Sequence, residues 1–148
     1  MSLQDRISQE IKAAMLAKAV ARLSTLRLLK SALGYLQIEK KVDSLPDGEV
    51  VAVVQKEIKK RRDSVEQFQA AGRTELAASE AAEILVLESF LPTALSAEEL
   101  EQLVRSTVTE LGATSKKDMS SVIKAVQGKA AGRADGKTIS TLVGKLLP

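Results

Sequence analysis

The segment with the clearest capacity for chemistry is the turn-rich run Gly132-Arg-Ala-Asp-Gly-Lys137, which precedes an expected helix. Exposed amides at a helix N-terminus favour anions, and Arg133 and Lys137 would add positive charge, so the run could hold a phosphate group. It is not a P-loop, because it lacks the glycine–lysine–serine/threonine spacing and a preceding strand. The alternative is a plain interhelical turn, in which the glycines supply positive φ and Asp135 caps the next helix. No balancing acid flanks Lys129 in the sequence, and we therefore favour phosphate binding.

Positive charge is concentrated in the last third of the chain. From Lys116 to the end there are seven basic and two acidic side chains, whereas residues 1–91 carry 14 basic and 13 acidic ones. A basic terminal module favours an acidic partner such as RNA, although lysines on a solvated helix surface would give the same composition. If the partner is RNA, these side chains are expected to contact its phosphates, so that the protein recognises the shape of the RNA rather than the edges of its bases. The candidate RNA-binding residues are Lys116, Lys117, Lys124, Lys129, Arg133 and Lys137.

Several residue types are missing or rare, and this excludes whole classes of function. The chain has no histidine and no cysteine, which excludes serine–histidine and cysteine–histidine catalysis, disulfides, iron–sulfur clusters and thiolate zinc sites. We expect no catalytic residue, no metal site and no cofactor, so that any enzymatic process is served by binding alone. Aromatic residues make up only 2% of the chain, which argues against base-stacking platforms. The apolar stretches are too short to span a bilayer and the N-terminus lacks signal-peptide features, so we expect a cytoplasmic protein.

Two further charged clusters have simple interpretations. The basic run from Lys56 to Arg62 is interleaved with acids, and Lys59–Asp63 and Arg62–Glu66 are spaced for i,i+4 pairing. This pattern favours a solvated helix that pairs its own charges. The glutamates that follow are spaced by about two helical turns, which is too wide for one cation: Glu75 with Glu83, and Glu80 with Glu88.

The elements that must position these residues are all helices. Apolar residues recur at helical spacing along the chain and no segment alternates with period two, so the predicted fold class is all-α. A core of Leu, Val, Ile and Ala with few aromatics agrees with packed helices. A break at Leu91-Pro-Thr-Ala-Leu95 divides an N-terminal four-helix region, 1–91, from a C-terminal three-helix module, 92–148. The seven expected helices cover about residues 3–15, 19–42, 48–71, 74–90, 97–111, 116–131 and 138–147.

Capping residues predict where these helices begin and end. Ser2 is expected to cap the first helix and Asp47 the third, because short polar side chains accept hydrogen bonds from free first-turn amides. Ser96 and Glu99 have the spacing of a capping box at the start of the fifth helix. Gly72 suits the left-handed residue that follows a helix end.

Seven short motifs follow one another along the chain in an order that carries a family resemblance. They are Arg22-Leu-Ser-Thr-Leu-Arg27, Arg61-Arg-Asp-Ser64 leading to Phe68, Ala71-Gly-Arg73, Glu88-Ser-Phe-Leu-Pro92 before Leu95-Ser-Ala-Glu-Glu-Leu100, Gly112-Ala-Thr-Ser115, Lys117-Asp-Met119 and Gly132-Arg-Ala-Asp-Gly-Lys137. With these motifs the chain resembles the YqeY family over essentially its whole length. Its last third resembles the tail domain of GatB, a subunit of the tRNA-dependent amidotransferase. The run Val126-Gln-Gly-Lys-Ala-Ala131 departs from the pattern, because it lacks the proline expected there, and this would alter the approach to the basic loop.

The resemblance implies a helical N-terminal region followed by a small helical C-terminal module. It also implies an association with tRNA-dependent amidation, because the GatB tail is thought to contact tRNA. The catalytic chemistry of GatB belongs to a different domain that has no counterpart in this chain. A label of carbon–nitrogen ligase with glutamine as amido-N-donor would therefore be inherited from the tail module rather than supported by residues of this sequence.

Three functional hypotheses follow from these observations. The first is a non-catalytic accessory protein that binds tRNA or another RNA through its basic C-terminal module. The second is a protein-interaction adaptor, in which the apolar stripes of the second and third helices dock on a partner or on a second copy. The third is an accessory subunit of a carbon–nitrogen ligase that uses glutamine as amide donor.

Overall fold

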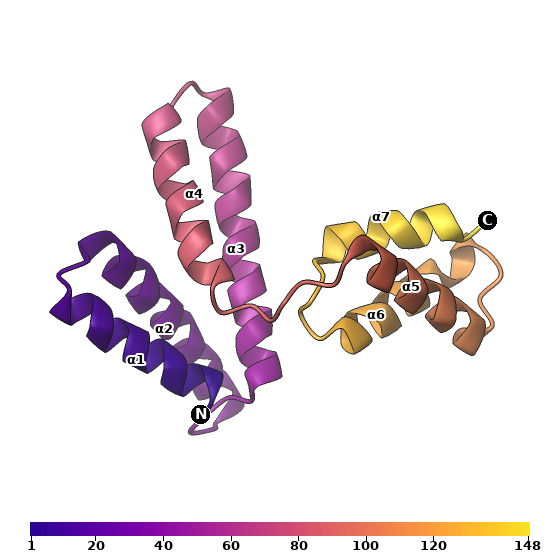
Figure 1. Cartoon of the computed structure of the whole chain (residues 1–148), viewed down its shortest axis with the longest axis horizontal. Helices are drawn as coiled ribbons and strands as arrows, with labels where there is room; N and C mark the ends of the chain where they lie inside the picture. Colours follow the sequence, from indigo (N-terminus) through magenta and orange to yellow (C-terminus); the bar gives the residue numbers. More distant parts are fainter. The chain divides into compact units, whose positions relative to one another are not determined.

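The computed structural model describes residues 1–148 and contains helices and turns but no strands, which confirms the all-α prediction (Figure 1). The chain divides into two compact units, which we call the first unit, Met1–Leu91, and the second unit, Pro92–Pro148. The first unit consists of α1 (Leu3–Leu16), α2 (Val20–Lys40), α3 (Asp47–Ala70) and α4 (Thr74–Glu88). The second consists of α5 (Ala97–Leu111), a single 3₁₀ turn (Lys116–Asp118), α6 (Met119–Ala130) and α7 (Gly136–Leu146).

The core of the first unit is aliphatic. Leu26, Leu29 and Leu33 recur every three or four residues along α2 and are buried against α1, α3 and α4. One aromatic ring joins this core: Phe90 is buried just after α4, and the Arg6 guanidinium lies 5.1 Å from its centroid. The leucine stripe of α2 is therefore buried in the core of the first unit. It is not available as the docking surface that the adaptor hypothesis requires.

The caps of the first unit agree with prediction at two ends and differ at a third. Ser2 and Asp5 form a capping box at the start of α1, and Gly72 follows α3 with φ +72°. The prediction that Asp47 caps α3 was wrong, because Pro46 is the N-cap and Asp47 is already helical. The Asp47 carboxylate instead accepts a hydrogen bond from the Leu3 amide at 2.9 Å, so it caps the neighbouring helix α1.

Charged side chains link α3 to α4. Arg61 is buried and its guanidinium lies 2.9 Å from the Glu57 carboxylate and 3.8 Å from that of Glu83. Burial, followed by the charge of Glu83 and a hydrogen bond to it, raises the pKa of Glu80 above its usual value, and nearby Arg61 opposes this rise.

The predicted i,i+4 pairs of Lys59 with Asp63 and of Arg62 with Glu66 do not form. Arg62 instead lies 3.6 Å from Glu88, on α4. The sequence spacing was compatible with pairing along α3, but the carboxylate of the packed neighbouring helix competes for the same guanidinium.

The second unit has its own core, built from one face of each of its three helices. Val104 of α5, Val122 and Val126 of α6, and Ile139 and Val143 of α7 are all fully buried. Short polar caps open two of the helices, because Ser96 accepts from the Glu99 amide and Asp135 from the Thr138 amide. The hydroxyl half of the predicted Ser96–Glu99 capping box is thus present, whereas the Glu99 carboxylate faces Arg133. No helix in either unit is both long enough and apolar enough to cross a membrane.

Candidate nucleic-acid interface

The loop between α6 and α7 has the geometry of a capped turn. Gly132 has φ +85°, which turns the chain after α6, and the Asp135 carboxylate accepts from the Thr138 amide at 2.7 Å. The carboxylate therefore occupies a place at the N-terminus of α7 where an external anion would otherwise be attracted. For this loop the plain-turn alternative describes the geometry better than a phosphate nest.

Arg133 fastens this loop to the segment that leads into α5. Its Nε donates to the Thr93 carbonyl at 2.9 Å, and its own carbonyl accepts from the Leu95 amide at 2.8 Å. A terminal nitrogen of the guanidinium also lies 3.8 Å from the Glu99 carboxylate. Arg133 is half-buried, and one of the five N–H donors of its side chain is used in a hydrogen bond within the protein.

Lys129 forms an ion pair with an acidic residue of another helix, Glu110 of α5. Its ammonium group pairs with Glu110 and lies 3.4 Å from the hydroxyl of Thr107, both on α5. The expectation that no acid balances Lys129 was wrong, because the balancing residue is 19 positions earlier in the chain and is brought close only by packing of α5 against α6. Sequence neighbours could not reveal this partner.

The other four predicted residues are exposed and form no ion pair. Lys116 and Lys117 lie in the 3₁₀ turn before α6, and Lys137 lies in the first turn of α7. Lys124 is two residues from both Val122 and Val126, so it projects from the side of α6 opposite the core. These four side chains come from three elements, and no single helix face gathers them.

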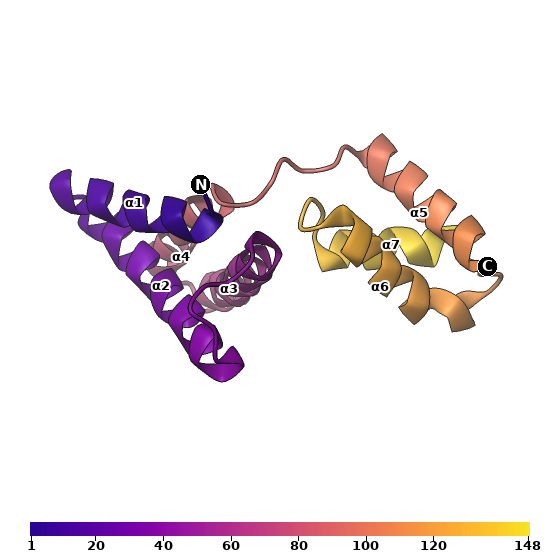
Figure 2. The same cartoon turned by 90° about the horizontal axis from the view of Figure 1, so that it is seen from below.

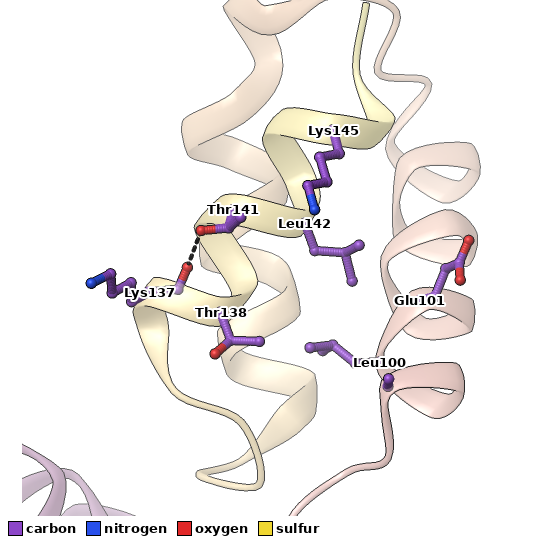
Figure 3. Close-up of a pocket in the computed structure, with 8 residues that line it drawn as sticks. Leu100, Glu101, Lys137, Thr138, Thr141, Leu142 and Lys145 are labelled. Atoms are coloured by element: carbon purple, nitrogen blue, oxygen red, sulfur yellow. Dashed lines mark hydrogen bonds between the residues drawn. The ribbon is translucent and has the colours of Figure 1, made fainter.

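A shallow groove of about 430 Å³ lies between α5 and α7 (Figure 3). Leu100 and Leu142 line it, and Thr138 points into it from α7, as Figure 3 shows. The Thr141 hydroxyl donates to the Lys137 carbonyl at 2.9 Å, so it is satisfied within α7.

Sequence reasoning missed one cation of this groove, Lys145. It is exposed, forms no ion pair, and lies two helical turns after Lys137 on the same side of α7. The spacing of Lys137, Thr141 and Lys145 at i, i+4 and i+8 was the available signal. Across the groove, the Glu101 carboxylate is held by Arg105 through two nitrogens at 3.1 and 2.8 Å.

The second unit as a whole is less basic than its last 33 residues. It carries eight basic and six acidic side chains, because α5 brings four glutamates. Three of these glutamates pair with Arg105, Lys129 and Arg133. Five lysines are left exposed and without an ion pair, and we call them the unpaired lysines: Lys116, Lys117, Lys124, Lys137 and Lys145.

Comparison with known proteins finds a family model that matches nearly the whole chain and relatives that match about two thirds of it. The family model described as "Yqey-like protein" matches residues 4–147. The chain is 35% identical over 108 residues to "Altered inheritance of mitochondria protein 41, mitochondrial" of Kluyveromyces lactis, a match that covers 71% of this chain and 58% of the relative. It is 34% identical over 91 residues to "Uncharacterized protein C22F3.15" of Schizosaccharomyces pombe, covering 62% of this chain and 73% of that protein. The chain thus spans less than two thirds of the length of the Kluyveromyces relative.

Proposed function

The chain belongs to the Yqey-like protein family, and we propose that it acts as a non-catalytic accessory protein that binds RNA, most simply tRNA, through its second unit. The five unpaired lysines are the observation that carries this proposal. The choice of tRNA rests on the resemblance of the last third of the chain to the amidotransferase tail. Any link to amidation would then be indirect, through the RNA that is bound.

The chemistry of the unpaired lysines suits phosphate groups. An ammonium group without an intramolecular partner loses no ion pair on meeting a phosphate, and it releases counterions from the RNA. Lys129 and Arg133 would first have to give up Glu110 and Glu99. We therefore assign the main contacts to Lys116, Lys117 and Lys124, with Lys137 and Lys145 flanking the α5–α7 groove.

Recognition by this surface would read backbone and shape. The three aromatic side chains of the protein all lie in the first unit, so the second unit offers no ring on which a base could stack. Lysines act as point charges and do not form the planar two-bond contacts by which arginine reads guanine. Binding should therefore depend on the fold of the RNA more than on its sequence.

The proposal is tested by titrating fluorescently labelled tRNA with the full chain at several salt concentrations. We expect affinity to fall steeply with salt, and the logarithmic salt slope to become smaller by about 2 to 3 in the triple variant Lys116→Ala, Lys117→Ala, Lys124→Ala, since each phosphate contact contributes about 0.9.

A triple variant in the first unit is the matched control: Lys12→Ala, Lys56→Ala, Lys59→Ala. These lysines are also exposed and form no ion pair, and the change in net charge is the same. An equal loss in this control, or an affinity that does not respond to salt, would contradict the proposal.

A further inference from the structure

Helix α2 carries apolar side chains on two opposite faces. One face holds the buried leucines of the core, Leu26, Leu29 and Leu33. The opposite face is lined by Val20, Ser24, Leu28, Ser31, Tyr35 and Ile38, which recur every three or four residues. Figure 2 shows α1 and α3 on one side of α2 and no other helix of the first unit on the opposite side.

This outer stripe exposes large apolar side chains. Val20, Tyr35 and Ile38 are 77%, 76% and 76% exposed, and Leu28 is half exposed. A helix that is apolar on both sides is usually covered on both sides. Tyrosine is enriched in protein interfaces, and Tyr35 is the only tyrosine of the chain. The stripe therefore has the composition of an interface that the first unit leaves open.

The stripe contains both a protrusion and a hollow. A shallow depression of about 290 Å³ forms where the small side chains of Ser24 and Ser31 alternate with the larger Val20, Arg27 and Leu28. The middle of this depression is nine to ten residues from Tyr35, which corresponds to about 14 Å along the helix. Tyr35 projects from the same face and has no neighbour covering it.

We propose that this stripe pairs with the same stripe of a second copy of the chain, with the two α2 helices antiparallel. In that arrangement each Tyr35 fits into the depression of the other copy, and the two contacts are equivalent by two-fold symmetry. The symmetry axis passes beside Ser31, midway between the depression and Tyr35. A parallel arrangement would place Tyr35 against Tyr35 and leave both depressions empty.

The polar groups of the depression match the ring that would enter it. Arg27 is exposed and forms no ion pair, so its guanidinium is available to lie against the face of the partner tyrosine ring. Ser24 and Ser31 offer hydroxyls to the phenol group. The two Arg27 side chains would be about 12 Å apart along the pair of helices, which limits their mutual repulsion.

The first test is the oligomeric state of the full chain, measured by sedimentation over a range of concentrations. We expect a species of twice 15.8 kDa that dissociates on dilution. Tyr35→Ala removes the protrusion and Ser24→Arg fills the depression, and each should raise the dissociation constant about tenfold or more. Leu85→Ala, which truncates an exposed leucine of α4, is the matched control and should leave it unchanged.

A monomer at the highest soluble concentration, or an equal effect of the control, would overturn the proposal. Circular dichroism of each variant shows whether helicity is preserved, which is expected because all three positions are exposed.

The second test fixes the direction of the helices. The protein has no cysteine, so a single introduced cysteine is unambiguous. Ser31→Cys lies beside the symmetry axis and should form a disulfide-linked dimer under mild oxidation, whereas Ser24→Cys should not. A mixture of Ser24→Cys and Ile38→Cys chains should form the mixed dimer. Self-linking of Ser24→Cys as efficient as that of Ser31→Cys would contradict the antiparallel arrangement.

Discussion

The surfaces of the two units of this protein differ in their exposed apolar side chains more than in their charged ones. In the first unit ion pairs join one helix to the next: Arg22 of α2 to Glu10 of α1, Lys40 of α2 to Glu49 of α3, and Arg61 and Arg62 of α3 to Glu83 and Glu88 of α4. In the second unit three cations are paired and five lysines remain unpaired on the surface. Exposed lysines without an ion pair are thus present in both units, five in the second and six in the first (Lys12, Lys18, Lys30, Lys41, Lys56 and Lys59), whereas the apolar stripe of α2 belongs to the first unit alone. The proposed protein contact is assigned to the first unit because of this apolar stripe. The proposed RNA contact is assigned to the second unit because of its five unpaired lysines together with the resemblance of the last third of the chain to the amidotransferase tail.

The largest loss in the free energy of unfolding is expected where a charged side chain is buried. Arg61→Ala should destabilise the first unit by about 2–3 kcal/mol, because it leaves the neighbouring Glu80 and Glu83 without their cation and removes the shorter ion pair of Glu57. The matched change in the second unit, Arg105→Ala, removes an exposed i,i+4 pair with Glu101 and should cost about 0.5 kcal/mol or less. Urea denaturation of the two variants checks this contrast. Equal losses would show that the units do not differ in this respect.

A change of about 1 kcal/mol is expected at the loop between α6 and α7. Asp135→Ala removes the cap of α7 and should lower the free energy of unfolding by about that amount, whereas Asp135→Asn keeps an acceptor and should cost less. Each change removes one negative charge, and tRNA affinity should rise only by the small amount that this loss of repulsion explains. A large gain in affinity for Asp135→Ala would indicate that the loop amides do bind phosphate.

A smaller effect, on tRNA affinity, is expected to differ between two lysines of α6. Lys124→Ala should weaken tRNA binding severalfold and reduce the salt slope by about 0.9, while Lys129→Ala should change both less, because Lys129 is paired with Glu110. Glu110→Gln releases Lys129 and should strengthen binding. Titrations of the three variants at one salt concentration are sufficient, and a reversed order of Lys124 and Lys129 would be incompatible with the role given to unpaired lysines.

The smallest effect is expected on the pH dependence of the stability of the first unit. The pKa of Glu80 is raised in the folded protein above its usual 4.5, so the folded state binds this proton more tightly than the unfolded state does. The resulting stabilisation is complete below the unfolded pKa and is lost as pH rises through the folded pKa. Glu80→Gln should therefore raise the melting temperature of the first unit slightly at neutral pH, by about 1–2 °C, and should lessen its decline between acidic and neutral pH. A melting temperature lowered at pH 7 would contradict this.

Features that depend on neighbours in sequence could be predicted well. The helices, the Ser2 cap and the positive φ after α3 all follow from apolar spacing and from the conformations open to serine and glycine. Features that depend on packing between helices could not be. The partner of Lys129 is on another helix, and Asp47 caps a helix whose start lies 44 residues away.

The candidate site shows the same limit. Composition indicated that the end of the chain is basic, but it could not separate cations held by glutamates from those left unpaired. The paired and the unpaired cations can be distinguished only when the packing of α5 against α6 is known, together with the contact of the Arg133 loop with residues 93–95. Lys145 lies eight residues beyond the glycine-rich loop, but its spacing from Lys137 places both on one side of α7.

The most direct test of the difference between the units is an amide chemical-shift map of the full chain, labelled with ¹⁵N and titrated with tRNA. We expect shifts to change around Lys116, Lys117 and Lys124 and along the outer side of α7, while those of residues 1–91 stay unchanged. Changes concentrated in the first unit, for example around Lys56 and Lys59 of α3, would contradict it.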